Sequence, residues 1–238
     1  MPNVERVTAA DVQRMQGLAR RVTATRPDLV NSDATFGELA WNWGKGHAAD
    51  GVNRPRRLWF SGGDLVAWSW ARLPHRVRRS DGSVKDATAD EAGPKAATAD
   101  EASPKAAVQA HLDAWAPSTY TAEGYQGVRQ TEAYRGDLHL LVEAPDGTMA
   151  SSTIMWLDEA NKTVEFEPVG THPEYRRLGL GRAMLLHGCT WARAAGARRV
   201  KAACLGAPGH PQARGLYYGV GFREFTRDVP LVKTRTEG

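Results

Sequence analysis

Cysteine is nearly absent from this sequence, and long hydrophobic runs are missing from it. Two cysteines in 238 residues allow at most one disulfide, and neither stands in a CxxC or Cys/His pattern with zinc spacing. The seven histidines show no metal-binding spacing such as HExxH. The longest apolar stretches fall far short of the roughly 18–20 residues that a membrane span needs. We therefore expect no disulfide scaffold, no metal and no membrane span.

The N-terminus also lacks a basic stretch that leads into an apolar segment, which is the pattern of a secretory signal. The expected location is the cytoplasm. With 42% hydrophobic and 24% charged residues, the composition is that of a globular chain, large enough for one large or two small domains.

Positive charge is concentrated in one segment. Residues 172–201 hold seven Lys or Arg residues against a single acidic residue, a net charge of +6, whereas the whole chain carries +4. Such a segment can bind nucleic acid, bind a phosphorylated cofactor, or form a solvated helix face. Charge alone leaves these three readings open.

A tandem repeat of ten residues divides the chain. Residues 87–96 (ATADEAGPKA) and 97–106 (ATADEASPKA) differ only at Gly93 and Ser103. Each copy carries a proline, which should stop any helix that its alanines favour. We expect a mobile linker over 81–105, an N-terminal part over 1–80 and a C-terminal domain over 106–238.

The two parts share an order of predicted elements. In the first, helices over 10–25 and 36–43 precede a hairpin over 57–73. In the second, helices over 107–115 and 121–131 precede a hairpin over 139–157. Only the second part continues, with a strand over 163–171, a helix over 179–195, a strand over 199–204, a short helix over 212–218 and a last strand over 222–228. This order predicts an α+β fold with a mixed, mainly antiparallel sheet. Residues 76–79 are a candidate for the first strand of the second part.

The most informative segment is the loop between the predicted strand over 163–171 and the following helix. It contains Arg176, Gly179 and Gly181 and opens directly into the helix. Glycines let the backbone turn its N–H groups toward a ligand, and a helix N-terminus adds a partial positive charge, so the loop suits a phosphate. A dinucleotide fingerprint fails because Met184 stands where the third glycine should be. A P-loop fails because Arg182 follows Gly181 in place of lysine.

Two motifs together resemble those of the GNAT superfamily, the Gcn-related N-acetyltransferases. The first is R-x-x-G-x-G at residues 176–181, the acyl-CoA-binding motif of that family. The second is ARGLYYGVGF at residues 213–222, which is similar to the family pattern A-x-x-L-Y-x-x-x-G-F. The resemblance covers roughly residues 107–230. It implies a GNAT fold, with a twisted sheet flanked by helices, and an N-terminal part that is a reduced GNAT-like repeat without a CoA site.

The resemblance also implies where acetyl-CoA binds. The strand end should splay from its neighbour and pair with the pantetheine arm, and the loop should hold the pyrophosphate through backbone N–H groups and arginine side chains. The implied contacts are Val169, Gly170, Thr171, Arg176, Arg177, Leu178, Gly179, Leu180, Gly181, Arg182, His210 and Ala213. Leu178 and His210 depart from the family pattern, because a basic or amide side chain and an asparagine are common there.

Direct transfer of the acetyl group to an amine, as in this family, needs an acid and a base. Tyr217 matches the family tyrosine that protonates the CoA sulfur; packing against the CoA helix is its alternative role. Glu165 and Glu167 alternate along one strand and share a face. We favour Glu167 as the base, since it lies nearer the strand end, with cross-strand pairing or solvent exposure as the alternative for either. His172 is a second candidate base.

These residues predict an acetyl-CoA-dependent N-acetyltransferase that acts on a primary amine of a small molecule or peptide. One alternative is a non-catalytic acyl-CoA-binding or regulatory module. Another is a nucleic-acid-binding protein, which the lack of aromatic residues within the basic segment disfavours. The acceptor, the acyl chain length and the oligomeric state, with a homodimer as one option, stay open.

Overall fold

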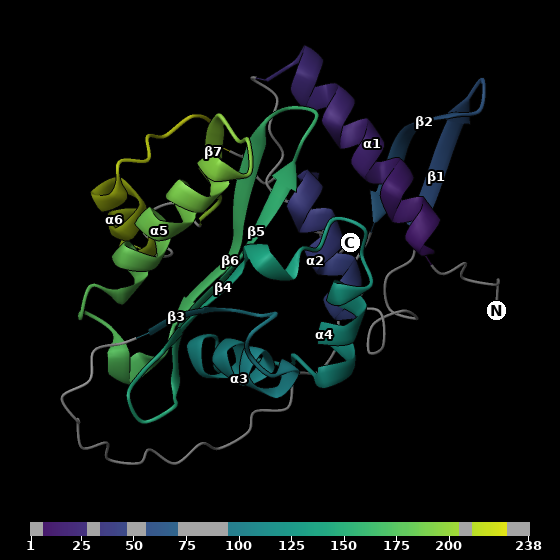
Figure 1. Ribbon diagram of the computed structural model, residues 1–238. Coiled ribbons are helices and arrows are strands. Elements are labelled where there is room, and N and C mark those ends of the chain that lie inside the picture. Colours follow the sequence, from purple (N-terminus) through teal and green to yellow (C-terminus); the bar gives the residue numbers. More distant parts are fainter. Residues whose placement is uncertain (1–6, 28–33, 47–55, 71–94, 205–210, 228–238) are drawn as a thin grey trace, which may run out of the picture.

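The computed structural model describes residues 7–27, 34–46, 56–70, 95–204 and 211–227. Most of the helices lie against one central sheet, and a separate two-stranded hairpin lies beside the first helix (Figure 1). No helix in these ranges is both long and apolar enough to cross a membrane.

The central sheet has five strands in the order β3-β4-β5-β6-β7. They are β3 (Lys95–Thr98), β4 (His139–Glu143), β5 (Met149–Asp158), β6 (Thr163–Thr171) and β7 (Arg199–Ala202). The first four pair antiparallel and β7 pairs parallel to β6. Strand β5 lies in the middle, and all of its residues after Met149 are buried. The mixed, mainly antiparallel sheet predicted from the sequence is confirmed.

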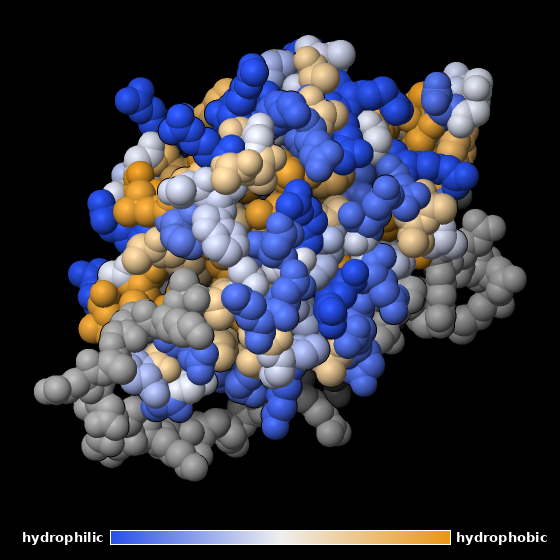
Figure 2. Space-filling view, viewed as in Figure 1, coloured by the Kyte–Doolittle hydropathy of each residue, from blue (hydrophilic) through white to orange (hydrophobic). Residues whose placement is uncertain are grey.

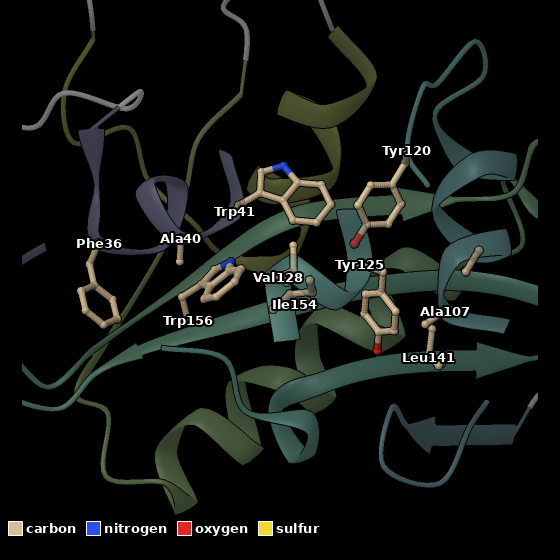
Figure 3. Close-up of a cluster of buried hydrophobic side chains, with 11 residues drawn as sticks. Phe36, Ala40, Trp41, Ala107, Tyr120, Tyr125, Val128, Leu141, Ile154 and Trp156 are labelled. Carbon is tan, nitrogen blue, oxygen red and sulfur yellow. The ribbon is translucent and has the colours of Figure 1, made fainter. Parts of the chain in front are cut away.

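Helices cover both faces of this sheet (Figure 1). On one face lie α2 (Phe36–Gly46), α3 (Pro104–Ala114) and α4 (Ala122–Arg129), and on the other lie α5 (Leu180–Ala194) and α6 (Pro211–Val220). Alternate strand residues separate the two cores: Ile154 and Trp156 face α2, α3 and α4, whereas Met155 and Leu157 face α5 and α6. Figure 3 shows the first core, with Trp41 of α2 packed beside Tyr120.

The N-terminal part forms α1 (Ala9–Thr25), α2 and a separate two-stranded sheet, β1 (Arg56–Ser61) with β2 (Asp64–Trp70). A capping box at Thr8 and Asp11 begins α1, and its apolar stripe packs on Leu39, Trp43 and Leu65. The predicted order of helix, helix and hairpin is present.

This part shares its core with the C-terminal domain. Helix α2 packs against α4 so closely that a Cβ on Gly44 would lie 2.5 Å from the Cα of Val128. The Glu165 carboxylate accepts hydrogen bonds from Thr35 Oγ1 at 2.7 Å and from the Gly37 N–H at 3.2 Å. The N-terminal part therefore packs against the second sheet through α2.

Two expectations about element positions are wrong. The first strand of the C-terminal sheet is β3, whose residues 95–98 were expected in a linker over 81–105; backbone pairing with β4 holds them in the sheet. Pro104 is the first residue of α3, where its missing N–H costs nothing, and Ser103 caps that helix. Residues 76–79 and 81–94 lie outside the described residues. The last expected strand is also absent, since residues 222–227 form no strand.

Tight packing between α2 and α4 makes Gly44→Ala a test of the shared core. We expect it to lower the free energy of unfolding by roughly 1–3 kcal/mol, because the added methyl must displace the backbone of Val128. Gly17→Ala in α1 is the matched control; its Cβ would meet only the Arg21 side chain, at 3.8 Å, and alanine should stabilise that helix by roughly 0.5–1 kcal/mol. Urea unfolding of both variants measures the difference, and equal effects would contradict a shared core.

Candidate acetyl-CoA site

Strand β6 leaves its neighbour β7 partway along its length. Parallel pairing with β7 ends at Phe166 and Ala202, while β6 continues to Thr171 in pairing with β5. A β-bulge at Glu167 and Pro168 marks the point of divergence. From Phe166 to Val169, β6 advances by three residues while β5 advances by two. Residues 167–171 thus have an edge that pairs with no strand in the described part of the chain.

The end of α3 lies directly against this free segment. A Cβ on Gly170 would come within 2.6 Å of the Ala114 Cβ and 2.9 Å of the Trp115 Nε1. Ser151 on β5 donates a hydrogen bond to the Gly170 carbonyl at 2.7 Å. Glycine is therefore required at position 170 for α3 to approach the strand.

The loop after β6 presents a row of unbonded N–H groups. Arg177 (φ +70°) and Gly179 (φ +82°) adopt left-handed conformations, and Gly179 caps α5 without a side-chain hydrogen bond. Among the described residues, no hydrogen-bond acceptor is found for the backbone N–H groups of residues 177–182. Gly181 packs so that a Cβ would lie 3.3 Å from Thr171 Oγ1. Consecutive N–H groups in such a turn, at a helix N-terminus, form a concavity that suits an anion.

The arginine side chains of the loop are exposed but differ in their contacts. Arg176 donates from Nε to the Thr171 carbonyl and from Nη2 to the Ala114 carbonyl, both at 3.1 Å, so it ties the loop to β6 and α3. Arg182 reaches the Gly219 carbonyl of α6 at 3.4 Å. Within the described ranges, neither residue nor Arg177 pairs with a carboxylate. Leu178, also exposed, adds an apolar side chain beside them. Figure 2 shows one face of the molecule, on which hydrophilic residues predominate and hydrophobic residues are scattered.

Helix α6 places Tyr217 in the second core. Its side chain is buried, its ring packs against Phe222 at 5.4 Å between centroids, and no hydrogen bond to its hydroxyl is found in the described part of the chain. Burial raises the pKa of Tyr217, and the nearby Glu167 carboxylate raises it further. The candidate acid and base thus lie within electrostatic reach of each other. Ala213 lies one turn earlier, whereas His210 lies outside the described residues.

The two glutamates of β6 occupy different environments. The Glu165 carboxylate is buried and fully bonded. It accepts the hydrogen bonds from Thr35 and Gly37, and it forms an ion pair with Lys201 at 3.5 Å. Glu165 therefore forms a cross-strand pair with Lys201, which was the alternative to a role as the base. Burial raises the pKa of Glu167 to about 8, and the Glu38 and Glu165 carboxylates add to the rise. The His172 Nδ1 accepts from the Glu174 N–H, and so caps a short turn.

An aromatic pocket that the sequence did not indicate lies on the α3 face of the bulge. Its lining includes Trp41, His111, Tyr120, His139, Ile154 and Pro168. Its members come from distant parts of the chain, and no local pattern joins them. Trp41 belongs to α2, so the N-terminal part contributes to this lining.

A comparison with protein families matches residues 106–222 to the acetyltransferase (GNAT) family. Residues 106–222, which contain the free edge of β6 and the loop that follows it, therefore form a domain of the GNAT family. In the described residues, no group of three or more His, Cys, Asp or Glu side chains gathers as a metal site would require.

Several solved structures are similar to part of the chain. The ribosomal-protein-S18-alanine N-acetyltransferase of Escherichia coli is 23% identical, with a TM-score of 0.45 over 55% of this chain and 78% of that one. An aminoglycoside 6'-N-acetyltransferase of Acinetobacter baumannii is 18% identical, with a TM-score of 0.46 over 60% and 100%. Glucosamine-6-phosphate N-acetyltransferase of Arabidopsis thaliana is 17% identical, with a TM-score of 0.42 over 60% and 99%. A search of curated proteins finds no match.

The raised pKa of Glu167 links stability to pH. A carboxyl whose pKa is near 8 in the folded state favours the protonated native state. Its contribution to the free energy of unfolding is complete below pH 4.5 and is lost as the pH rises to about 8. Burial lowers the pKa of His111 to about 4 and that of His139 to about 3. These histidines act oppositely, because the native state loses stability only as the pH falls below 6.5. Between pH 6.5 and 8, the Glu167 effect stands alone among these three groups.

We therefore expect the melting temperature of the unaltered protein to fall relative to that of Glu167→Gln as the pH rises from about 6.5 to 8. The amide cannot ionise, so the variant escapes this loss. Calorimetric melting at several pH values measures the difference. Glu132→Gln, at an exposed position, should track the unaltered protein, and a pH-independent difference for Glu167→Gln would contradict the raised pKa.

Proposed function

We propose that this protein is an acetyl-CoA-dependent N-acetyltransferase that transfers an acetyl group directly to a primary amine of a small molecule or peptide. The observation that carries the proposal is the meeting of two features at one place: a free edge of β6 over residues 167–171 and the unbonded N–H groups of residues 177–182. Together they can hold an extended amide-bearing chain and its pyrophosphate.

Each part of acetyl-CoA has matching groups in this site. The peptide groups of Val169, Gly170 and Thr171 would pair with the amides of the pantetheine arm, as a further strand does. The N–H groups of the loop and the first turn of α5 would bind the pyrophosphate, with Arg177 and Arg182 as counter-charges. Arg176 acts mainly by fixing the loop, given its two carbonyl contacts. Leu180 and Ala213 lie on α5 and α6 behind this surface.

Acetyl-CoA supplies an activated acetyl group as a thioester. The amine must be neutral to attack the thioester. For a lysine-like amine with a pKa near 10.4, deprotonation at pH 7 costs about 4.6 kcal/mol. Glu167, with a pKa of about 8, is matched to accept that proton near neutral pH. The amine nitrogen then forms the C–N bond, the C–S bond breaks, and Tyr217 donates its proton to the departing sulfur. The proton that the nitrogen loses as it becomes an amide restores the Tyr217 hydroxyl.

The N-terminal part would be a reduced repeat of the same fold. Its order of helix, helix and hairpin supports this interpretation, as does the absence of a second R-x-x-G-x-G motif in residues 1–80. The cytoplasm is the location that we propose. A non-catalytic acyl-CoA-binding module is the second candidate, favoured by the dense packing around Tyr217.

Calorimetric titration with acetyl-CoA tests the binding site. Gly181→Asp should weaken binding by roughly a hundredfold or more, because a carboxylate in the cradle repels the phosphates. Arg176→Ala should weaken it by about tenfold through loss of the two loop contacts. Gly17→Asp in α1 is a control with the same change of charge and should bind as the unaltered protein does. An absence of binding by the unaltered protein would overturn the proposal.

Release of CoA thiol with a panel of amines separates the enzyme from the binding module. Tyr217→Phe and Glu167→Gln should each lower kcat by roughly 10² to 10⁴ while the Kd of acetyl-CoA stays the same. Tyr218→Phe is the control, since that hydroxyl is on the exposed side of α6 and bonds to Glu224. Tight binding of acetyl-CoA without thiol release for any amine would favour the non-catalytic module.

A further inference from the structure

The aromatic pocket contains two buried polar atoms that have no hydrogen-bond partner among the described residues. They are the His111 Nδ1 and the Tyr120 hydroxyl. Tyr120 is only 9% exposed, and its hydroxyl points inward toward Ile154 (Figure 3). A buried polar group without a partner costs about 1–3 kcal/mol, so two in one pocket call for a ligand that would bond both.

The pocket lies next to the reacting centre. Pro168, which lines it, directly follows Glu167 at the bulge of β6. Lys45 lowers both the pKa of Glu167 and that of His111, so the three side chains share one electrostatic neighbourhood. A group bound between His111 and Tyr120 would therefore be adjacent to the segment where the thioester is expected.

The chemistry of the lining suits an amine that has lost its proton. Burial lowers the pKa of His111 to about 4, so the ring is neutral at pH 7 and can accept a hydrogen bond from an N–H. Burial also raises the pKa of Tyr120, which stays a neutral hydroxyl. The Trp41 ring closes the pocket, 5.2 Å from His111 and 5.2 Å from Tyr120 between centroids.

The pocket is also narrow. Its cavity volume of about 10 Å³ corresponds to a single water-sized group. Trp41, His111 and Tyr120 pack against one another and surround the pocket on three sides. If an amine nitrogen occupies the pocket, these rings leave no room for a second substituent on the carbon that carries it.

We propose that the aromatic pocket binds the acceptor's reacting amine and restricts it to an unbranched primary amine, a –CH₂–NH₂ head whose N–H groups bond the His111 Nδ1 and the Tyr120 hydroxyl. This inference rests on the proposed function. It assigns a binding role to Trp41, so the N-terminal part completes the acceptor site.

Four isomeric amines test the selection by shape: n-butylamine, sec-butylamine, tert-butylamine and N-methylpropylamine. They have the same composition and similar basicity but differ in substitution around the nitrogen. Thiol release in the presence of saturating acetyl-CoA should be at least about tenfold faster with n-butylamine than with the other three. Equal rates would overturn the inference while leaving the proposed function intact. Failure to bind acetyl-CoA in the calorimeter would overturn both.

A pair of tyrosine variants tests the hydrogen bonds. Tyr120→Phe should raise KM for n-butylamine about threefold to tenfold, leave the Kd of acetyl-CoA unchanged, and keep or raise the melting temperature, because it removes an unpartnered buried hydroxyl. The Tyr134 hydroxyl instead bonds the His139 Nδ1 at 3.1 Å and the Tyr125 hydroxyl at 3.0 Å. Tyr134→Phe should therefore lower the melting temperature and leave KM unchanged.

The combined pattern separates ligand binding from a structural role. A lower melting temperature for Tyr120→Phe with an unchanged KM would assign Tyr120 to the core and overturn the inference. His111→Phe tests the same pocket a second time: it should raise KM for n-butylamine similarly, because an aromatic ring is kept and the acceptor nitrogen is lost. An unchanged KM for both variants would also overturn it.

Discussion

Strand β6 carries the constraint on which the rest of the molecule depends. Up to Phe166 it is bonded on both edges, to β5 and β7, and Val164 and Phe166 fill the core under α5 and α6. Beyond the bulge it keeps β5 as its only strand partner in the described part of the chain, so every second residue of this segment directs its peptide groups to an edge that no strand covers. In an interior where backbone groups are almost always paired, such an edge persists only where a ligand or water can reach it.

The same strand places two glutamates two residues apart in opposite electrostatic situations. Glu165 lies at the centre of bonds from Thr35, Gly37 and Lys201, which compensate its burial. Glu167 is largely removed from solvent with two other carboxylates nearby, and its pKa rises to about 8. When two neighbouring carboxylates lie in environments that give them different pKa values, one commonly serves a structural role and the other a reactive one. The bonds from Thr35 and Gly37 thus anchor the N-terminal part and hold in place a carboxylate that raises the pKa of Glu167.

Local patterns were enough to predict most helices and strands of the C-terminal domain and the glycine loop that opens α5. The spacing of Arg176, Gly179 and Gly181 is a local signal, because the turn and the first helical turn are contiguous in sequence. Strand β3 could not be predicted from such a signal, because residues 97–106 nearly repeat residues 87–96 and the whole segment therefore has the pattern of a low-complexity linker. The two copies differ only at Ser103, which caps α3. The aromatic pocket was equally invisible, because it joins residues 41, 111, 120 and 168. Pairing and packing between distant segments decided both.

The extent of the folded unit follows from these contacts. The segment that matches the family, residues 106–222, lacks both β3 and α2. Without α2, the face that carries Trp156 and Val128 would be open to water, and Glu165 would lose two of its hydrogen bonds while still buried on β6. Exposing that apolar surface and leaving a buried carboxylate partly unbonded both cost free energy. The N-terminal residues are therefore part of the same cooperative structure as the domain that bears the motifs.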